Sequence, residues 1–294
     1  SETNPIKKQQ LKNEIDRLIY KITKGHKEFD FEVYFSEVFR EKGGFDIVIA
    51  NPPYISTKGV SENVKKLLQK YYGFADDLYS HFYFRSMEIL KKNGILTYIS
   101  SKTFWTIQTK KNLRELILKN QLLQLVDAGN PFDAPMVDTC VILVQKQLNS
   151  PNNYIFKYID GTKNFTLPTI NEGKIEYYKN APNNVFFPIN EYNLKIYKRY
   201  GKKVNELLNQ WWTKVSTSKN IEKYKKELET YRKSLKPGDI TLLGLITEGG
   251  QGLATGNNGK YIGVLEGTKW AENVRKQMPE KLLLAAKFCS RQGI

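Results

Sequence analysis

Cysteine and histidine are scarce in this sequence, which leaves little basis for metal or disulfide chemistry. Among 294 residues there are two histidines and two cysteines. Cys140 and Cys289 have no paired spacing, so neither a disulfide framework nor a zinc site is expected. Cys140 lies in an apolar run, which predicts a buried thiol. His26 and His81 are too far apart to suggest a metal site, and we expect none.

Long apolar runs are also lacking. No stretch approaches the ~18 consecutive apolar residues that cross a bilayer, and residues 1–12 lack the apolar core of a signal peptide. Hydrophobic residues make up 40% of the chain and aromatic residues 13%, which indicates a folded protein with room for roughly two domains. We therefore expect a cytoplasmic protein without a membrane partner.

Acidic residues are few relative to basic ones. The chain has 46 Lys and Arg against 30 Asp and Glu, which gives a net charge of +16 and a pI of about 9.5. Such a charge attracts polyanions, and nucleic acid is the usual one. Lysine is spread along the whole sequence, however, so a solvated basic surface explains the composition equally well.

Over its first half the sequence alternates between helical periodicity and short apolar strands. The helical patterns lie at 11–22, 62–72 and 78–90, and the strands at 44–50, 95–99, 122–126 and 139–144. Strands that alternate with helices predict an α/β domain with a largely parallel sheet. The strand at 44–50 is apolar on both faces, so we expect it to be buried.

The pattern changes after a linker-like stretch at 149–153. Short strands are expected at 154–159 and 174–178, and a basic helical region follows at about 190–235. The sequence Lys-Pro-Gly-Asp at 236–239 ends that region. We therefore predict three parts, residues 1–150, 151–236 and 237–294.

The motif with the clearest chemistry is Asn51-Pro52-Pro53-Tyr54, directly after the strand at 44–50. Ligands of open α/β sheets bind beyond the carboxyl ends of strands. The Asn51 oxygen and the Pro52 carbonyl are two acceptors for the hydrogens of a planar amino group such as that of adenine. The prolines stiffen the loop and remove backbone donors, and Tyr54 offers a face on which an extruded base can stack. An ordinary turn also fits, because Asn and Pro are common in turns.

Residues 44–55 resemble motif IV of the gamma-ordered N6-adenine DNA methyltransferases, in particular the type IIG restriction–modification enzymes. Further likeness follows in order at 77–82, at 90–96 with 100–105, and at Phe132 before the strand 137–146. The resemblance implies part of a Rossmann-like class I methyltransferase sheet, then a helical linker and the start of an α+β target-recognition domain. It also implies site-specific methylation of double-stranded DNA with S-adenosylmethionine as the cofactor.

The resemblance assigns roles to single residues. It implies that Asn51-Pro52-Pro53-Tyr54 is the catalytic motif that holds a flipped adenine, and that Phe132 lines the other side of the base. It implies that Asn51 and Phe82 contact the cofactor. Phe82 also fits a core position at helical spacing, and Asp77 fits the N-cap of the following helix.

The glycine loop with which this family binds its cofactor is not found before Asn51, so we expect a fragment whose upstream portion lies elsewhere in the enzyme. Residues 249–261 resemble the opening of the family's target-recognition domain. The DNA contacts expected there are Thr255, Asn257, Asn258 and Lys260. A polar hairpin loop fits the same residues.

Two alternative functions stay open. A DNA-binding or specificity fragment without catalysis fits the missing cofactor loop and the charge of +16. Methylation of RNA or of protein glutamine fits the motif, because those substrates also present a planar amino group. The basic helical region and the recognition-like segment favour DNA.

Overall fold

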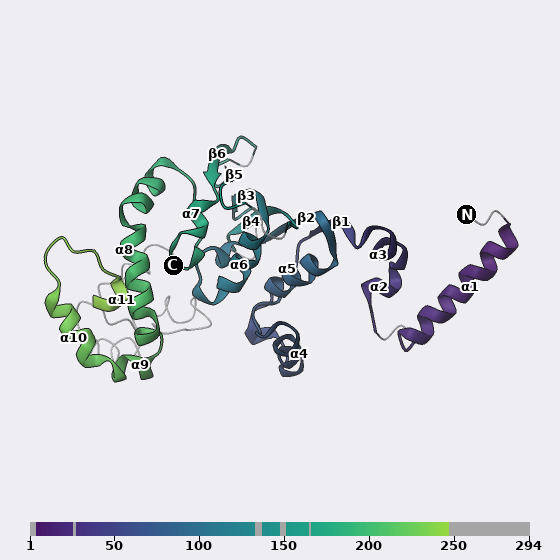
Figure 1. Ribbon diagram of the computed structural model, residues 1–294, viewed down its shortest axis with the longest axis horizontal. Helices are drawn as coiled ribbons and strands as arrows, with labels where there is room; N and C mark the ends of the chain where they lie inside the picture. The colour runs from purple at the N-terminus through teal and green to yellow at the C-terminus, as the bar shows by residue number, and fades with distance from the viewer. Residues whose placement is uncertain (1–3, 26–27, 133–136, 148–150, 165, 247–294) are drawn as a thin grey trace, which may run out of the picture. The chain divides into compact units, whose positions relative to one another are not determined.

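The computed structural model describes residues 4–25, 28–132, 137–147, 151–164 and 166–246 (Figure 1). The chain divides into two compact units, Ser1–Leu242 and Leu243–Ile294. The described part of the second unit is the short helix α11 (Leu243–Ile246). The part boundaries at 150 and 236 stay predictions. The DNA contacts expected at Thr255, Asn257, Asn258 and Lys260 lie outside the described residues.

The first unit is built on a six-stranded mixed sheet with the order β1-β2-β4-β3-β5-β6. Its strands are β1 (Phe45–Ala50), β2 (Leu90–Ser101), β3 (Gln121–Gly129), β4 (Thr139–Gln145), β5 (Ile155–Asp160) and β6 (Thr169–Lys174). The pairs β1–β2 and β3–β5 are parallel, whereas β4 is antiparallel to both of its neighbours and β6 to β5. The α/β class is confirmed. The expectation of a largely parallel sheet is wrong, because the connection from β3 to β4 is too short for a crossover helix.

Most of the predicted strands are confirmed, including the one at 154–159, which is β5. The strand predicted at 174–178 is wrong. β6 comes earlier and pairs with β5 from Asp160 opposite Thr169 to Ile155 opposite Lys174. Residues Glu176–Lys179 form the short helix α7 instead. The loop that joins β5 to β6 places Thr169 opposite Asp160, and this first pair sets the register of the two strands.

Three helices lie between the strands in the chain: α4 (Glu62–Tyr72), α5 (Leu78–Ile89) and α6 (Lys111–Lys119). The side chain of Ser61 accepts a hydrogen bond from the Val64 N–H at the start of α4, and Gly73 ends it with a φ of 77°. The helices predicted at 62–72 and 78–90 are therefore confirmed. The remaining described helices of this unit are α1 (Pro5–Ile22), α2 (Phe31–Tyr34), α3 (Ser36–Lys42), α8 (Glu191–Val215), α9 (Ser218–Lys223) and α10 (Lys225–Ser234), with 3-10 turns η1 (Thr57–Gly59), η2 (Lys102–Trp105), η3 (Gln108–Lys110) and η4 (Pro182–Asn184).

Helix α1 (Pro5–Ile22) contains the periodic pattern predicted at 11–22, but none of its residues is buried. Asn4 caps its first turn by accepting a hydrogen bond from the Ile6 N–H at 3.0 Å. The apolar face is open, with Leu11 44% exposed and Ile15 55% exposed. None of the helices that the structure describes is both long and apolar enough to cross a membrane.

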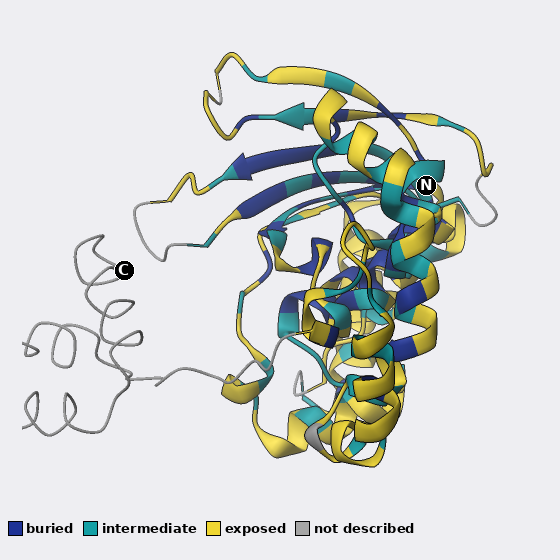
Figure 2. Cartoon of the chain, turned by 90° about the vertical axis from the view of Figure 1, so that its left-hand side faces the viewer, coloured by how far each residue is buried: buried dark blue, intermediate teal, exposed yellow. Residues whose placement is uncertain are grey.

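The hydrophobic core combines residues of the central strands with residues of α5 and α6. Figure 2 shows buried residues in dark blue on the inner strands of the sheet. Along β4, Cys140, Ile142 and Val144 are fully buried, while the residues between them are half-buried. Fully burying such an aliphatic side chain contributes about 1.5–3 kcal/mol. The prediction of a buried Cys140 thiol is confirmed.

Strand β1 departs from its prediction. In the described part of the chain it is an edge strand, with Ile47 61% exposed and Ile49 77% exposed, so the expectation of burial is wrong there. Gly44, just before it, has a φ of 137°, and a Cβ at this position would lie 2.5 Å from the Ile89 carbonyl oxygen. This close approach fixes the start of β1 against β2. Within the described residues, no strand pairs with the outer edge of β1, and its two isoleucines are exposed.

Four strand ends lie at one edge of the sheet, which we call the carboxyl edge. β2 and β3 both run antiparallel to β4, so they point the same way, and β1 and β5 run parallel to them. The last residues of these strands are Ala50, Ser101, Gly129 and Asp160. The Asn-Pro-Pro-Tyr motif follows Ala50, and Phe132 lies shortly after Gly129. The topology therefore places the motif and Phe132 at the same edge.

Candidate active site

The loop after β1 presents Asn51 to solvent. Asn51 is exposed, Pro52 is buried and Pro53 is exposed again. Within the described residues the Asn51 side chain has no hydrogen-bond partner, so its oxygen is available as an acceptor. Neither proline has a backbone N–H, and Pro52 is held inside the protein. The motif therefore combines a stiff backbone with a free amide.

Tyr54 is half-buried, and its ring is fixed by packing. It meets Tyr79 edge-on, with the ring centroids 6.2 Å apart and the planes at 74°. Its hydroxyl is buried and has no hydrogen-bond partner among the described groups. Burial raises the pKa of Tyr54 to about 12, so the side chain is neutral at physiological pH. Tyr54 is thus a neutral, positioned aromatic surface rather than an acid or a base.

Phe132 lies in the turn after β3 and is 39% exposed. Its backbone N–H donates a hydrogen bond to the Asn130 side-chain oxygen at 3.3 Å, which shapes the turn. Among the described rings, Tyr54 pairs with Tyr79, and no ring pair joins Tyr54 to Phe132. Both aromatics are therefore at the carboxyl edge without contacting each other. Their predicted roles on either side of a base stay predictions.

The segment after the motif is tied to the start of α5. The Leu78 N–H donates to the Ile55 carbonyl at 2.9 Å. The backbone N–H and the hydroxyl of Thr57 both donate to Oδ1 of Asp77, at 3.0 Å and 3.2 Å. Asp77 is the N-cap residue of α5, as the sequence predicts, but its side chain makes no capping hydrogen bond. Its carboxylate instead binds Thr57 and so ties the segment after the motif to the start of α5.

Asp77 is in turn held by Lys110, a lysine with only 3% of its side chain exposed. The Lys110 Nζ lies 2.7 Å from Oδ2 of Asp77 and also forms an ion pair with Asp76. It sits 5.1 Å from the centre of the Tyr79 ring, which in turn packs on Tyr54. Burial alone would raise the pKa of Asp77, but the hydrogen bonds from Lys110 and Thr57 outweigh it and lower that pKa.

We call Asp76, Asp77 and Lys110 the Lys110 cluster; the sequence did not reveal it. Lys110 stands in a polar run, Thr109-Lys110-Lys111, in which a lysine is normally solvated. The adjacent carboxylates at 76 and 77 were the available signal, because two acidic residues just before an apolar helix need a cation if they are buried. The cluster contacts the buried side of the motif loop and fixes its position.

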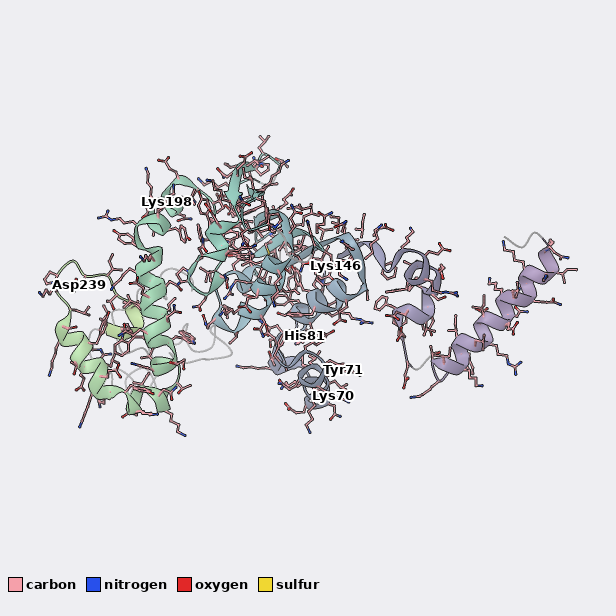
Figure 3. The ribbon with its side chains drawn as sticks, in the orientation of Figure 1. Lys70, Tyr71, His81, Lys146, Lys198 and Asp239 are labelled. Atoms are coloured by element: carbon pink, nitrogen blue, oxygen red, sulfur yellow. The ribbon has the colours of Figure 1, made fainter. Side chains whose placement is uncertain are left out.

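His81 is buried next to this cluster on α5 (Figure 3). Its Nε2 accepts a hydrogen bond from the Asp76 N–H at 3.0 Å, so the neutral ring carries its proton on Nδ1. The ring stacks on Phe74, with centroids 4.8 Å apart. Burial lowers the pKa of His81, against the attraction of Asp76. His81 is therefore a neutral structural side chain.

Phe82, the next residue, faces an apolar groove rather than the core. It is 39% exposed, so the core alternative for this residue is wrong. The groove has a volume of about 640 Å³. It is lined mainly by apolar side chains of β1, α4 and α5, among them Ile47, Ile49, Leu68, Leu78, Phe82 and Ile89. Phe82 thus stays available for an apolar or aromatic partner.

A second buried ion pair lies at the carboxyl edge. Asp127, near the end of β3, is 3% exposed and pairs with Lys102, which follows β2. The Lys102 Nζ lies 4.8 Å from the centre of the Trp105 ring, and its backbone N–H donates to the Asp138 carbonyl at 2.8 Å. The sequence did not reveal this pair either. It fixes the strand end from which Phe132 emerges.

The first part of the chain is similar in sequence to a known protein family and to several named enzymes. The sequence model of the family described as Eco57I restriction-modification methylase matches residues 1–133. A Methanocaldococcus jannaschii protein named as a type II restriction enzyme and methyltransferase is 31% identical over 170 residues, 55% of this chain and 14% of that protein. The type II methyltransferase M.VspI of a Vibrio species is 24% identical over 131 residues, 45% of this chain and 32% of that protein.

Other matches are of the same kind. The type II restriction enzyme and methyltransferase RM.Eco57I of Escherichia coli is 31% identical over 112 residues, 35% of this chain and 11% of that protein. A solved DrdV–DNA complex is 15% identical with a TM-score of 0.31, over 44% of this chain and 16% of that one. The chain therefore spans a third or less of these relatives. The segment 1–133 is therefore similar in sequence to the Eco57I restriction-modification methylase family.

Proposed function

We propose that this chain is the base-holding part of an S-adenosylmethionine-dependent DNA methyltransferase that modifies adenine N6 in a restriction–modification system. One observation carries the proposal: the Asn51 amide is exposed, has no partner among the described residues and lies on a stiff proline loop at the carboxyl edge. The Lys110 cluster braces that loop. The family match over the same residues and the names of the relatives support this reading.

The motif suits a planar amine because of the groups that it offers. The Asn51 Oδ1 and the Pro52 carbonyl accept the two hydrogens of the adenine amino group. This arrangement favours the geometry in which the nitrogen lone pair points out of the ring plane, toward a methyl donor. The base must leave the duplex to reach these acceptors. Tyr54 and Phe132 then stack on it, each worth roughly 1–3 kcal/mol.

The residues present fit part of a cofactor site. Phe82 is exposed on the apolar groove beside α5, which suits an aromatic ring, and Asn51 is free at the carboxyl edge. In the proposal these two residues contact S-adenosylmethionine. The cofactor supplies the methyl group that the amine attacks. The chain's own groups orient the amine and exclude water from it.

We propose further that an upstream portion of the same enzyme covers the groove and pairs with the free edge of β1. Ile47 and Ile49 are 61% and 77% exposed there, and an unpaired strand edge is a ready partner for another strand. That portion would supply the glycine loop for the cofactor. The DNA contacts in the proposal are Thr255, Asn257, Asn258 and Lys260, supported by the resemblance of residues 249–261. A cytoplasmic location follows from the DNA substrate.

A substrate screen tests the proposed function. The full-length protein is incubated with tritiated S-adenosylmethionine and with duplex DNA, RNA or a protein extract, and labelled DNA is digested to nucleosides. The proposal predicts label in DNA as N6-methyladenine. Label confined to RNA or to protein glutamine would replace DNA by one of those substrates. DNA binding without any label would favour a non-catalytic DNA-binding module.

A further inference from the structure

A polar pocket away from the groove has no part in the proposed reaction. It has a volume of about 490 Å³ and lies between the start of α6, the turn that joins α7 to η4, and one face of α8. Among the residues that the structure describes, three lysines, five asparagines, Ala181 and Tyr197 line it, and no carboxylate does. Its charged and amide residues are Lys111, Lys179, Lys202, Asn180, Asn183, Asn184, Asn205 and Asn209.

The α8 wall of this pocket is a set of free donors. Lys202, Asn205 and Asn209 recur at helical spacing, so they share one face of α8. Within the described residues none of these three side chains has a hydrogen-bond or ion-pair partner. Asn205 is nevertheless half-buried, whereas Lys202 and Asn209 are exposed. Amides without a partner beside a free ammonium group are suited to a ligand rich in acceptor oxygens.

The opposite wall is rigid. The buried Arg114 guanidinium donates to the Asn183 carbonyl from Nε at 3.2 Å and from Nη2 at 3.1 Å. The Asn184 amide donates to the Lys179 carbonyl at 2.9 Å. Lys111 completes this wall, and its partner Glu115 lies 3.6 Å away in an exposed pair. Exposed pairs of this length contribute little, so Lys111 is free to exchange partners.

The pocket is close in the chain to the braced motif loop. Lys111 directly follows Lys110, and Lys110 reaches the loop through Asp77 and Thr57. Further cations line α8, including Lys198, which Figure 3 labels, while the chain as a whole carries a charge of +16. A long polyanion held at Asn51 would be attracted to the donors of this pocket.

We propose that this pocket binds a phosphodiester of the DNA backbone that flanks the target base. The proposal rests on the proposed function and adds a contact that positions the duplex without reading its sequence. The ammonium groups of Lys111 and Lys202 neutralise the phosphate, and the Asn205 and Asn209 amides donate to its oxygens. The same chemistry would suit a free phosphate ester, and the test separates these two sources.

The test measures how salt weakens binding of the full-length protein to duplex DNA. Each phosphate whose neutralisation is lost flattens the slope of log affinity against log salt by about 0.9. Lys111 and Lys202 neutralise one phosphate in the proposal, so the variant Lys111→Gln/Lys202→Gln is expected to flatten the slope by about 1 and to bind roughly tenfold more weakly at low salt. The control Lys92→Gln/Lys174→Gln removes two exposed lysines that do not line the pocket and should keep the wild-type slope. Equal slopes for all three proteins, or equal losses in both variants, would overturn the proposal.

Lysine acylation read by mass spectrometry identifies the ligand. Duplex DNA should protect Lys111 and Lys202 but not Lys92, whereas inorganic phosphate and deoxyadenosine monophosphate should protect neither. Equal protection by a free phosphate ester would replace the backbone contact by a small-anion site. The outcomes also separate the two proposals. Methylation of DNA with unchanged salt slopes rejects the pocket alone, and DNA binding without methylation rejects the proposed reaction alone.

Discussion

Lys110 holds its ammonium nitrogen 2.7 Å from a carboxylate oxygen of Asp77, and the other oxygen of that carboxylate receives two hydrogen bonds from Thr57. A buried cation is thus linked by one carboxylate to the loop that carries Asn51. Because this buried charge orders the loop without contacts at Asn51, Asn51 stays accessible to the substrate in the proposed function. The proposed chemistry depends on this arrangement.

Replacing Lys110 tests the support of the loop. Lys110→Met leaves Asp76 and Asp77 without their cation, and removing one partner of a buried pair is costly. We expect a loss of about 2–4 kcal/mol in the free energy of unfolding, measured by urea denaturation, with part of the charge on Asp77 still solvated. Lys110→Arg retains the cation and should recover most of the loss. Equal stability of wild type and Lys110→Met would show that the cluster does not brace the fold.

Tyr54→Phe separates the ring of Tyr54 from its hydroxyl. The hydroxyl is buried without a hydrogen-bond partner among the described groups, so its removal relieves an unsatisfied polar group. We expect stability to rise by about 1 kcal/mol and methylation to be retained, because only the ring stacks on the base. A loss of methylation of tenfold or more in a folded Tyr54→Phe protein would show that the hydroxyl takes part in the reaction.

The sequence predicted the motif and its strand, but not what surrounds them. The local signals sufficed for β1 and α4, because a short apolar run, Ser61 and Gly73 act within a few residues. Local signals did not predict the position of β6, because pairing with β5 sets its register. They also did not predict the exposure of Ile49, because that depends on whether another strand pairs with the outer edge of β1. The burial of Lys110 was not predicted, because nothing in its own segment distinguishes a buried lysine from a solvated one.

His81 predicts how stability depends on pH. Its pKa is lowered from 6.5 by burial, and protonation would place a second donor where Nε2 now accepts from Asp76. The unfolded chain therefore takes up a proton first as pH falls. The contribution of neutral His81 to the free energy of unfolding should be fully present above about pH 6.5 and should be lost as pH falls toward the lower pKa of the folded state. Urea denaturation between about pH 8 and pH 5 should show this slope in wild type and a smaller one in His81→Gln. Identical profiles would remove His81 from the account.

Variants that lack the ring of Phe132 or of Tyr54 are expected to hold an extruded base less well. Removing either ring should cost about 1–3 kcal/mol of stacking on an extruded base. In duplex DNA with 2-aminopurine at the target position, fluorescence on binding should rise less with Phe132→Ala or Tyr54→Ala than with wild type. The affinity for the duplex itself should change little, since most of it comes from phosphate contacts. Unchanged fluorescence in both variants would leave the two rings without a role in base flipping.

The role of Asn51 is the central claim, and single-turnover methyl transfer at saturating DNA measures it most directly. With Asn51→Ala, the account predicts a rate at least about 10²–10³-fold below wild type, because one of the two acceptors for the amino group is gone. Affinity for DNA should stay near the wild-type value. A rate within a few-fold of wild type, with N6-methyladenine still formed, would contradict the account.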